Sequence, residues 1–287
     1  MPTRAHWALA FSLLPWTERR KGTLGTQLAE GGDPPLSAVE ARDLAALAGR
    51  LSQLQDEAHR LGARLLLPGD PGVDRLLPAL PYPVALWVRG TLPPEGPSIA
   101  VVGSRKASSR GLLLARDWSR ALTQGGVGVL SGLARGIDGA AHGGALEAGP
   151  TWGVLGSGLH HPYPAEHQPL MDRMVAAGGG VLTCFPPDAQ PLPWHFPKRN
   201  WLLAAWTQGV LVVEGGLRSG SLVTARLALD LGRELWVIPG RPEDPGSEGP
   251  LALLREGAAR AARNPGDLLE DLGLPRPEAQ GPSPRRH

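Results

Sequence analysis

Short apolar runs alternate with helical stretches between residues 98 and 240, and this alternation constrains the fold more than any other feature of the chain. The apolar runs are rich in valine, leucine and isoleucine and cover Ile99–Val102, Val127–Leu130, Thr151–Leu155, Gly180–Cys184, Val210–Glu214 and Glu234–Ile238. Helical patterns lie between most of them, at Arg110–Thr123, Ile137–Ala148 and Ser221–Leu231. Apolar strands separated by helices predict a parallel sheet covered on both faces. The expected fold is therefore α/β, an extended Rossmann-like, doubly wound and mostly parallel sheet.

Residues 1–60 are expected to form a small helical domain in front of this sheet. One apolar helix is predicted over Ala5–Leu14 and a longer one over Ser37–Arg60, with a polar, Gly/Pro-rich segment between them. Ser37 and Glu40 have the spacing of a capping box, in which each side chain satisfies a backbone amide at the start of a helix. The start of the longer helix is therefore predicted at Ser37.

The remaining segments connect the sheet to its surroundings. Residues 61–97 contain short apolar runs interrupted by prolines, so they are expected to be a connecting segment with one possible strand at Ala85–Arg89. The sheet domain is expected to cover 98–273. Residues 274–287 are rich in proline and are predicted to be a disordered tail, or a linker to a C-terminal domain that is absent here.

Composition excludes several functional classes. The single cysteine, Cys184, excludes a disulfide within the chain and fits a reducing cytoplasm. One cysteine and scattered histidines offer no metal-binding cluster. No apolar run approaches the ~18 residues that span a bilayer, so no membrane segment is expected. The formal net charge is only +2, but residues 98–240 carry 12 basic and 9 acidic side chains, a small excess in the region of the glycine loops.

Four loops that follow predicted strands combine glycine with serine, and three of them also carry a basic side chain. In an open parallel sheet, ligands bind beyond the carboxyl ends of the strands. Glycine lets the backbone approach a ligand, serine offers a hydroxyl, and the next helix directs its amide dipole outward. The loops together predict a phosphate site, although each alone could be only a tight turn. The candidate residues are Gly103, Ser104, Arg105, Lys106, Ser131, Gly132, Arg135, Arg218, Ser219 and Gly220, with Gly156–Gly158 as a further loop.

Neither common nucleotide motif fits these loops. Gly215 and Gly220 have the glycine spacing of a Walker A loop, but Ser221 stands where that loop requires lysine, which argues against an ATPase. After the first strand, Gly103 is followed by Ser-Arg-Lys instead of a second glycine, and Arg105 would crowd a pyrophosphate there. No cofactor is therefore expected.

The segment 195–201, His-Phe-Pro-Lys-Arg-Asn-Trp, places two cations beside aromatic rings and an amide. Cations hold backbone phosphates and aromatic faces stack on unpaired bases, so Phe196, Lys198, Arg199 and Asn200 predict single-stranded DNA as the ligand. The alternative is a solvated basic helix start whose aromatic side chains belong to the core.

These side chains are expected to converge with Arg105 and Arg135 on one groove at the carboxyl edge of the sheet. Pro197 suits the first turn of a helix, so a helix N-terminus is predicted there, with free amides that add to the positive charge. Arg105 and Arg199 are each expected to hold phosphate and to be removable without an effect on folding.

Several of these motifs together resemble the DNA-processing protein A family. The most specific elements are Ser-Gly-Leu-Ala-Arg-Gly-Ile-Asp over 131–138 with His142, Phe-Pro-Lys-Arg-Asn over 196–200, and Ser-Gly-Ser-Leu-Val-Thr-Ala over 219–225. These three unrelated loops agree with the family in order and spacing. Further matching segments are Leu80–Pro83, Leu86–Gly90, Val101–Arg105, Gly156–Pro164, Val213-Glu214 and Ile238–Gly240.

The resemblance implies an extended Rossmann fold, an N-terminal domain similar to a sterile alpha motif, and a protein of natural transformation that binds and protects incoming single-stranded DNA. It also implies loading of the RecA recombinase, a homodimer, and no established catalysis. Many members carry a C-terminal winged-helix domain, which is expected to be absent here. The chain departs from the family at Thr183-Cys184, His160 and Trp201, where Ser-Glu, Asp and Arg are common; Trp201 removes a charge and adds a stacking face.

An enzyme is the rival hypothesis. Nucleoside monophosphate phosphoribohydrolases, a related Rossmann family, use a Pro-Gly-Gly-x-Gly-Thr loop followed by a catalytic glutamate, whereas no carboxylate lies between Glu214 and Asp230 here. Asp138 and His142 could form an acid/base pair, but an aspartate at a helix start more often stabilises amides. Glu214 could be a general base, although orienting the neighbouring loop is the preferred interpretation. Binding without catalysis is therefore expected, with a nucleotide hydrolase as the alternative.

Two late helices are predicted around Leu251–Arg263 and Pro265–Leu272, and their leucines form apolar stripes with little chain left to cover them. The stripes predict a homodimer interface, and the family resemblance suggests that the same region meets the recombinase. The alternative is that the leucines cap the sheet internally. The candidate interface residues are Leu251, Leu254, Leu268, Leu269 and Leu272.

Overall fold

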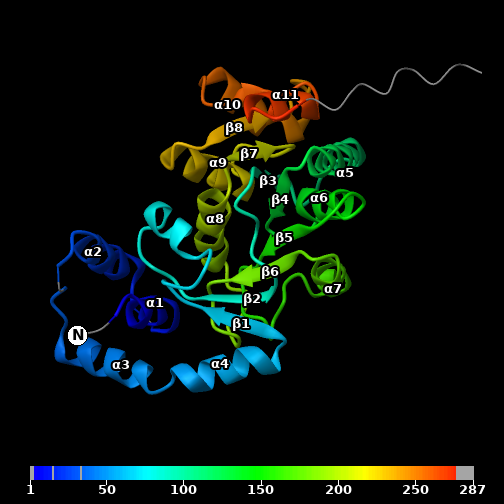
Figure 1. Cartoon of the computed structure of the whole chain (residues 1–287). Helices are drawn as coiled ribbons and strands as arrows, with labels where there is room; N and C mark the ends of the chain where they lie inside the picture. The colour runs from blue at the N-terminus through cyan, green and yellow to red at the C-terminus, as the bar shows by residue number, and fades with distance from the viewer. Residues whose placement is uncertain (1–2, 15, 33, 276–287) are drawn as a thin grey trace, which may run out of the picture.

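The computed structural model describes residues 3–14, 16–32 and 34–275, and it contains one nine-stranded sheet with helices on both faces (Figure 1). The strand order is β1-β2-β6-β5-β4-β3-β7-β8-β9, and the pairs from β6 to β9 are parallel. All six predicted strands are present as β3 (Ser98–Val102), β4 (Gly128–Ser131), β5 (Thr151–Val154), β6 (Gly180–Thr183), β7 (Gly209–Val212) and β8 (Glu234–Val237). The predicted fold class is confirmed.

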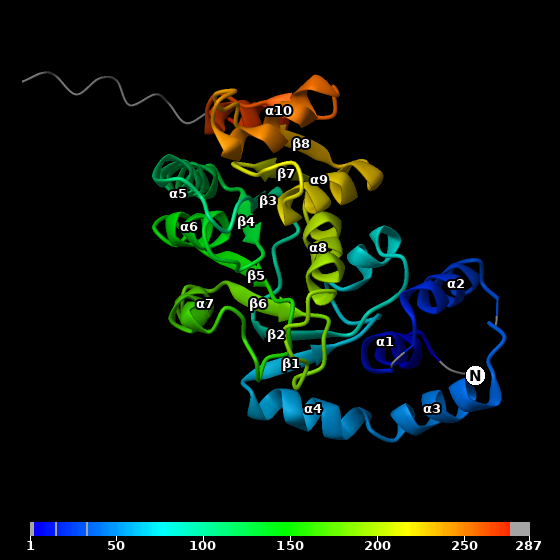
Figure 2. The ribbon, with the colours of Figure 1, turned by 180° about the vertical axis from the view of Figure 1, so that it is seen from behind.

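Alternate residues of the central strand β3 face two separate apolar layers. Ile99 and Val101 pack in the core beneath α5 (Ser109–Gln124) and α6 (Ile137–Ala145), and α7 (Gln168–Ala176) lies on the same face. Ala100 and Val102 pack in the opposite core with α8 (His195–Trp206) and α9 (Gly220–Asp230), as the view from behind in Figure 2 also shows. This alternation is the two-residue period of a strand that is buried on both faces.

The segment 61–97 belongs to the sheet, which corrects its expected role as a connection. Its strands β1 (Ala63–Leu66) and β2 (Leu86–Gly90) form an antiparallel pair, and β2 continues antiparallel onto β6. Five of the prolines lie between the two strands, where a short 3-10 helix, η1 (Asp74–Ala79), forms, and the other three follow β2. The possible strand at Ala85–Arg89 is therefore confirmed, whereas β1 gave too short an apolar signal to be predicted.

Four helices precede the sheet: α1 (Arg4–Leu13), α2 (Glu18–Ala29), α3 (Ala38–Ala48) and α4 (Leu51–Arg60). The capping box of Ser37 and Glu40 is present at the start of α3. The expected single helix over 37–60 instead divides at Gly49.

Helix α2 lies in a segment that was expected to be irregular. Thr17 caps its first turn, because its side chain accepts a hydrogen bond from the Arg20 amide at 3.2 Å. A Cβ at Gly25 would overlap the backbone of Pro81, so this glycine allows the helix to pack directly on that segment. Tertiary packing therefore stabilises a helix whose glycines lower its intrinsic propensity.

The chain after β8 forms α10 (Glu248–Arg255), the short strand β9 (Arg260–Ala261) and α11 (Pro265–Asp271). Leu268 and Leu269 are 0% exposed and pack in the core with Trp118 and Trp236. The prediction that these two leucines form a dimer interface is wrong, because they cover the sheet of their own chain. Leu251, Leu254 and Leu272 are half-buried. Of the tail expected over 274–287, residues 276–287 lie outside the described residues.

Two further 3-10 helices, η2 (Ala165–His167) and η3 (Pro245–Ser247), complete the elements of the described chain. Within the same described ranges, no helix is long and apolar enough to cross a membrane.

The buried histidine of α6 leads to a test of the core by pH. His142 is fully buried, with Nδ1 2.8 Å from the Thr151 hydroxyl, which itself donates to the Val129 carbonyl. Nδ1 is therefore the protonated nitrogen of a neutral ring. Burial, together with the nearby positive charges of His167 and Arg199, lowers the pKa of His142 from 6.5 to about 3.

Below pH 6.5, His142 takes up a proton in the unfolded chain. In the folded chain it stays neutral until about pH 3. The unfolding free energy is therefore expected to fall as the pH drops through this window, by up to about 1.4 kcal/mol per unit from His142. His142→Asn keeps a donor near the position of Nδ1 but cannot titrate. Urea unfolding at several pH values should show a shallower decline for this variant than for the wild type. Identical slopes would contradict a neutral, buried His142.

Candidate functional site

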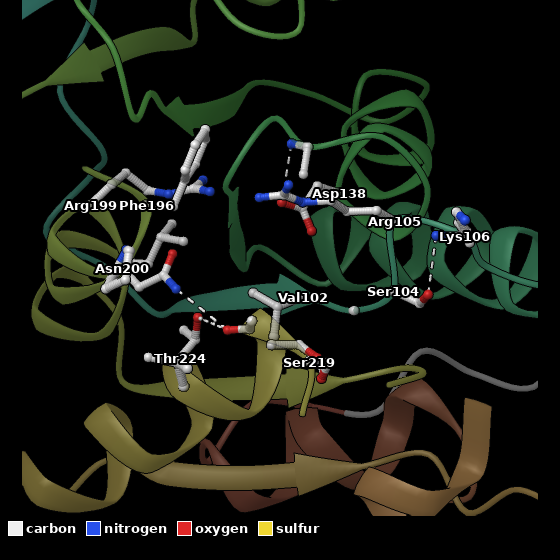
Figure 3. A pocket seen from close by; sticks show the side chains of 17 residues that line it. Val102, Ser104, Arg105, Lys106, Asp138, Phe196, Arg199, Asn200, Ser219 and Thr224 are labelled. Atoms are coloured by element: carbon white, nitrogen blue, oxygen red, sulfur yellow. Dashed lines mark hydrogen bonds between the residues drawn. The ribbon is translucent and has the colours of Figure 1, made fainter. Parts of the chain in front are cut away.

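The order in which the chain adds strands to the sheet reverses at β3. A pocket opens at the carboxyl end of this strand. Strand β3 pairs with β4 on one side and with β7 on the other, which makes it the switch point of the sheet. The loop after β3 and the first turn of α9 diverge at this point and enclose a volume of about 520 Å³ (Figure 3). This switch-point pocket is lined by Val102, Gly103, Ser104, Arg105, Lys106, Ala134, Asp138, Phe196, Pro197, Arg199, Asn200, Leu203, Ser219, Gly220, Ser221, Val223 and Thr224.

Helix α8 forms one wall of the pocket with a single face. Phe196, Arg199, Asn200 and Leu203 are spaced three or four residues apart, so they lie on the same side of the helix. The Asn200 side chain donates to the Gly220 carbonyl at 3.4 Å and so joins α8 to the start of α9 (Figure 3).

Arg199 is a buried cation at the base of the pocket. Only 4% of the residue is exposed, and its Nη1 donates to the Val154 carbonyl at 2.9 Å. A Cβ at Gly132 would overlap the guanidinium, so this glycine makes room for the arginine. Burial lowers the pKa of Arg199 to about 10, which still leaves the group charged at neutral pH. Its buried Nε has no partner among the described residues.

Asp138 is the acidic side chain of the lining, and it lies close enough to Arg199 for their charges to interact. Its carboxylate accepts a hydrogen bond from the Ala134 amide at 3.2 Å. Burial raises the pKa of the Asp138 carboxyl, and the positive charge of Arg199 opposes that shift. Asp138 thus binds an amide of the loop before α6, whereas it was expected to stabilise the amides of its own helix. His142 hydrogen-bonds Thr151 instead, so the alternative acid/base pair does not form.

The loop after β3 supplies the exposed positive charge of the pocket. The Arg105 guanidinium lies over the Phe196 ring, with its central carbon 5.0 Å from the ring centroid. Ser104 accepts a hydrogen bond from the Lys106 amide at 3.1 Å, which fixes the turn between them. Gly103 lies against Ile137 of α6, where a side chain would overlap that isoleucine. The structure thus brings Gly103, Ser104, Arg105, Lys106, Phe196, Arg199, Asn200, Ser219 and Gly220 together, as the sequence predicts.

Two predicted glycine-loop residues have structural roles beneath the pocket. The Ser131 hydroxyl is fully buried and donates to the Val101 carbonyl at 2.6 Å, so it is not available to a ligand. Gly132 is buried under Arg199. The loop at Gly156 likewise supports the Phe196 ring from below instead of lining the pocket.

Three predicted basic side chains do not reach the pocket. Arg135 is exposed and forms an ion pair with Glu166, and Arg218 is exposed outside the lining. Lys198 lies on the opposite face of α8, with its Nζ 3.5 Å from the Glu18 carboxylate. The predicted convergence with Arg105 is therefore wrong for Arg135 and Lys198.

Several residues that line the switch-point pocket are not among the site residues that the sequence predicts. Ser221, Val223 and Thr224 lie on the first turns of α9 and enter the pocket because that helix starts at its edge. Helical spacing after Gly220 could have indicated them. The Glu214 carboxylate accepts from the Ser108 amide at 2.9 Å and from its hydroxyl at 2.5 Å, so it orients the start of α5, outside the lining.

Comparison with known proteins agrees with this geometry. A model of the family described as DNA recombination-mediator protein A matches residues 71–273, which include the whole switch-point pocket. The chain belongs to this family.

Relatives of this chain are found in several bacteria. Protein Smf of Escherichia coli is 44% identical over 211 residues, which cover 72% of this chain and 56% of that protein. DNA processing protein DprA of Bacillus subtilis is 38% identical over 193 residues, which cover 66% of this chain and 64% of that protein. The matched regions thus span less than two thirds of the length of either relative.

Two solved structures of DNA processing protein A resemble this chain. The X-ray structure from Streptococcus pneumoniae has a TM-score of 0.73 at 31% identity and covers 94% of this chain and 99% of that one. A structure from Helicobacter pylori, described for its single-stranded DNA binding mode, has a TM-score of 0.64 at 26% identity. It covers 73% of this chain and 95% of that one.

The burial of Arg199 overturns the expectation that its removal leaves folding intact. Arg199→Ala is expected to lower the unfolding free energy by about 3 kcal/mol, because it leaves the Asp138 carboxyl buried without its counter-charge. Arg135→Ala removes an exposed, ion-paired arginine and should change the value by less than about 1 kcal/mol. Urea denaturation of both variants measures the difference. An unchanged midpoint for Arg199→Ala would show that this arginine does not hold the base of the pocket.

Proposed function

We propose that this protein binds single-stranded DNA, with the phosphate backbone held in the switch-point pocket. The observation that carries the proposal is the meeting of three sources of positive potential in one cavity. These are the buried Arg199, the exposed Arg105 and Lys106, and the first turn of α9. Ser219 makes no side-chain cap on that turn, so its hydroxyl does not compete with an anion for the first amides, although the Leu222 amide bonds the Ser219 carbonyl at 3.2 Å.

The shape of the pocket favours one strand over two. A volume of about 520 Å³ is in the range of small-ligand sites and suits a nucleotide that enters the cavity, which a paired base cannot do. Phe196 lines the cavity and offers an aromatic face to an unpaired base. The single-stranded DNA binding mode described for the Helicobacter pylori relative supports the same conclusion.

We infer from the family that the bound strand is passed to a RecA-type recombinase, in natural transformation or recombination, and that the protein acts as a homodimer. A recombination mediator must protect a strand and then release it to the protein that pairs it, which calls for binding without cleavage. The half-buried leucines Leu251, Leu254 and Leu272 are the members of the predicted interface that still offer apolar surface.

A nucleotide hydrolase has less support. The first turn of α9 contributes hydroxyl and amide groups to the pocket, while Glu214 is engaged by Ser108 outside the lining. Asp138 is buried and its carboxylate is held by the Ala134 amide, so it is not presented to a substrate as a free base.

Oligonucleotide binding across a salt series tests the proposal. Single strands are expected to bind more tightly than duplexes of equal length, with little sequence preference and with affinity that falls steeply as salt displaces the phosphate contacts. Arg105→Ala should weaken single-strand binding about tenfold to a hundredfold, the range for a lost hydrogen bond to a charged group, and should flatten the salt dependence.

Arg64→Ala is the matched control, because Arg64 is an exposed arginine on β1 at the far edge of the sheet. It should bind like the wild type. Equal affinity of the wild type for duplex and single strand, or an Arg105→Ala variant that binds normally, would reject the switch-point pocket as the DNA site.

The proposed dimer is tested at α10. A Leu251→Glu, Leu254→Glu double variant is expected to be monomeric in light scattering where the wild type is dimeric, because two charges would oppose apolar contact. Leu113→Glu, at an exposed leucine of α5, is the control and should remain dimeric. A double variant that stays folded and dimeric would place the interface elsewhere.

A further inference from the structure

Helix α8 has a second pocket on the face that points away from the switch point. Trp194, Pro197, Lys198 and Trp201 recur at helical spacing, opposite Phe196 and Arg199. They close a cavity of about 320 Å³ against Glu18 of α2 and the segment around Tyr82. We call this cavity the tryptophan pocket.

The walls of the tryptophan pocket are flat and aromatic. Trp194 is 66% exposed, a large fraction for the biggest apolar side chain, and Trp201 is only half-buried. The Trp194 ring makes an edge contact with His195 and leaves most of its surface open to solvent. An exposed indole at the mouth of a cavity is a surface for a planar ligand.

One end of the tryptophan pocket is polar. The Tyr82 hydroxyl donates to the Glu18 carboxylate, and the Lys198 ammonium lies 3.5 Å from the same carboxylate. Lys198 also lies 5.3 Å from the centroid of the Tyr82 ring. The pocket thus combines a stacking surface with hydrogen-bonding groups at one edge, which is the pattern of a heteroaromatic base and not of an aliphatic chain.

The two pockets meet at the first turn of α8, where Pro197 lines both. A helix with its side chains is about 10–12 Å across, a distance that a short stretch of extended single strand can cover. Lys198, the next residue along the helix, lines the tryptophan pocket. A strand leaving the switch-point pocket across Pro197 therefore reaches the tryptophan pocket directly.

We infer that the tryptophan pocket takes an unpaired nucleobase of the strand whose phosphates lie in the switch-point pocket, stacked on Trp194 and Trp201. This inference rests on the function proposed above. It assigns the two faces of α8 to two parts of one ligand, the phosphate backbone on one face and a base on the other.

The test compares variants with an oligothymidylate and with the same oligomer carrying abasic positions. Trp194→Ala and Trp201→Ala are each expected to weaken binding of the intact strand roughly fivefold to a hundredfold, as for lost base–aromatic stacking. Trp194→Phe should retain most of the affinity. Leu113→Ala, which removes a comparably exposed apolar side chain from α5, should bind normally.

Abasic positions separate stacking from a general loss of structure. The wild type should lose affinity for the abasic strand, whereas Trp194→Ala should lose little more, because its stacking surface is already gone. Trp194 is exposed, so its replacement leaves folding intact.

The outcomes distinguish this inference from the proposed function. Tryptophan variants that bind the intact strand as the wild type does, while Arg105→Ala is weakened, overturn the inference and leave the switch-point pocket standing. The same result is expected if the pocket instead takes an aromatic side chain of a protein. A wild type that binds no single strand overturns both.

Discussion

The buried guanidinium of Arg199 is the interaction on which the site depends. It joins α8 to the carbonyl of Val154 at the end of β5, and it occupies space that Gly132 leaves open after β4. A buried cation is unfavourable unless opposite charge and hydrogen bonds compensate it, and Asp138 supplies the charge. The first turn of α8 is thereby held against the carboxyl ends of neighbouring strands, where a Rossmann-like sheet binds its ligands.

The position of α8 divides one short sequence between two surfaces. Phe196 and Arg199 face the switch point, whereas Lys198 and Trp201 face α2 and the segment around Tyr82. Neighbouring residues of a helix point about 100° apart, so a continuous basic and aromatic stretch cannot serve a single groove. Helix α2 and the connection between β1 and β2 are therefore part of the environment of the site, because they line the second surface.

Ion pairing decides where positive charge is available. The net charge of +2 says little, and Arg135 and Lys198 each face a carboxylate. Among the described residues, no ion pair engages Arg105 or Lys106, and both are exposed at the mouth of the switch-point pocket. Within the switch-point pocket, the exposed positive charge thus lies on one loop, next to the first turn of α9.

The sequence by itself determined the strands β3 to β8, most of the helices between them and the family motifs, because strand and helix periodicity and glycine turns are local properties. It also placed the glycine loops at one edge, since parallel strands end on the same side. Only the tertiary structure decided which loops line the pocket, that α2 forms, and that Leu268 and Leu269 are interior. The tertiary structure also decided which way each side chain of α8 points. These outcomes depend on what a residue packs against, and its partners, such as Gly132 for Arg199 or Trp236 for Leu269, lie far away along the chain.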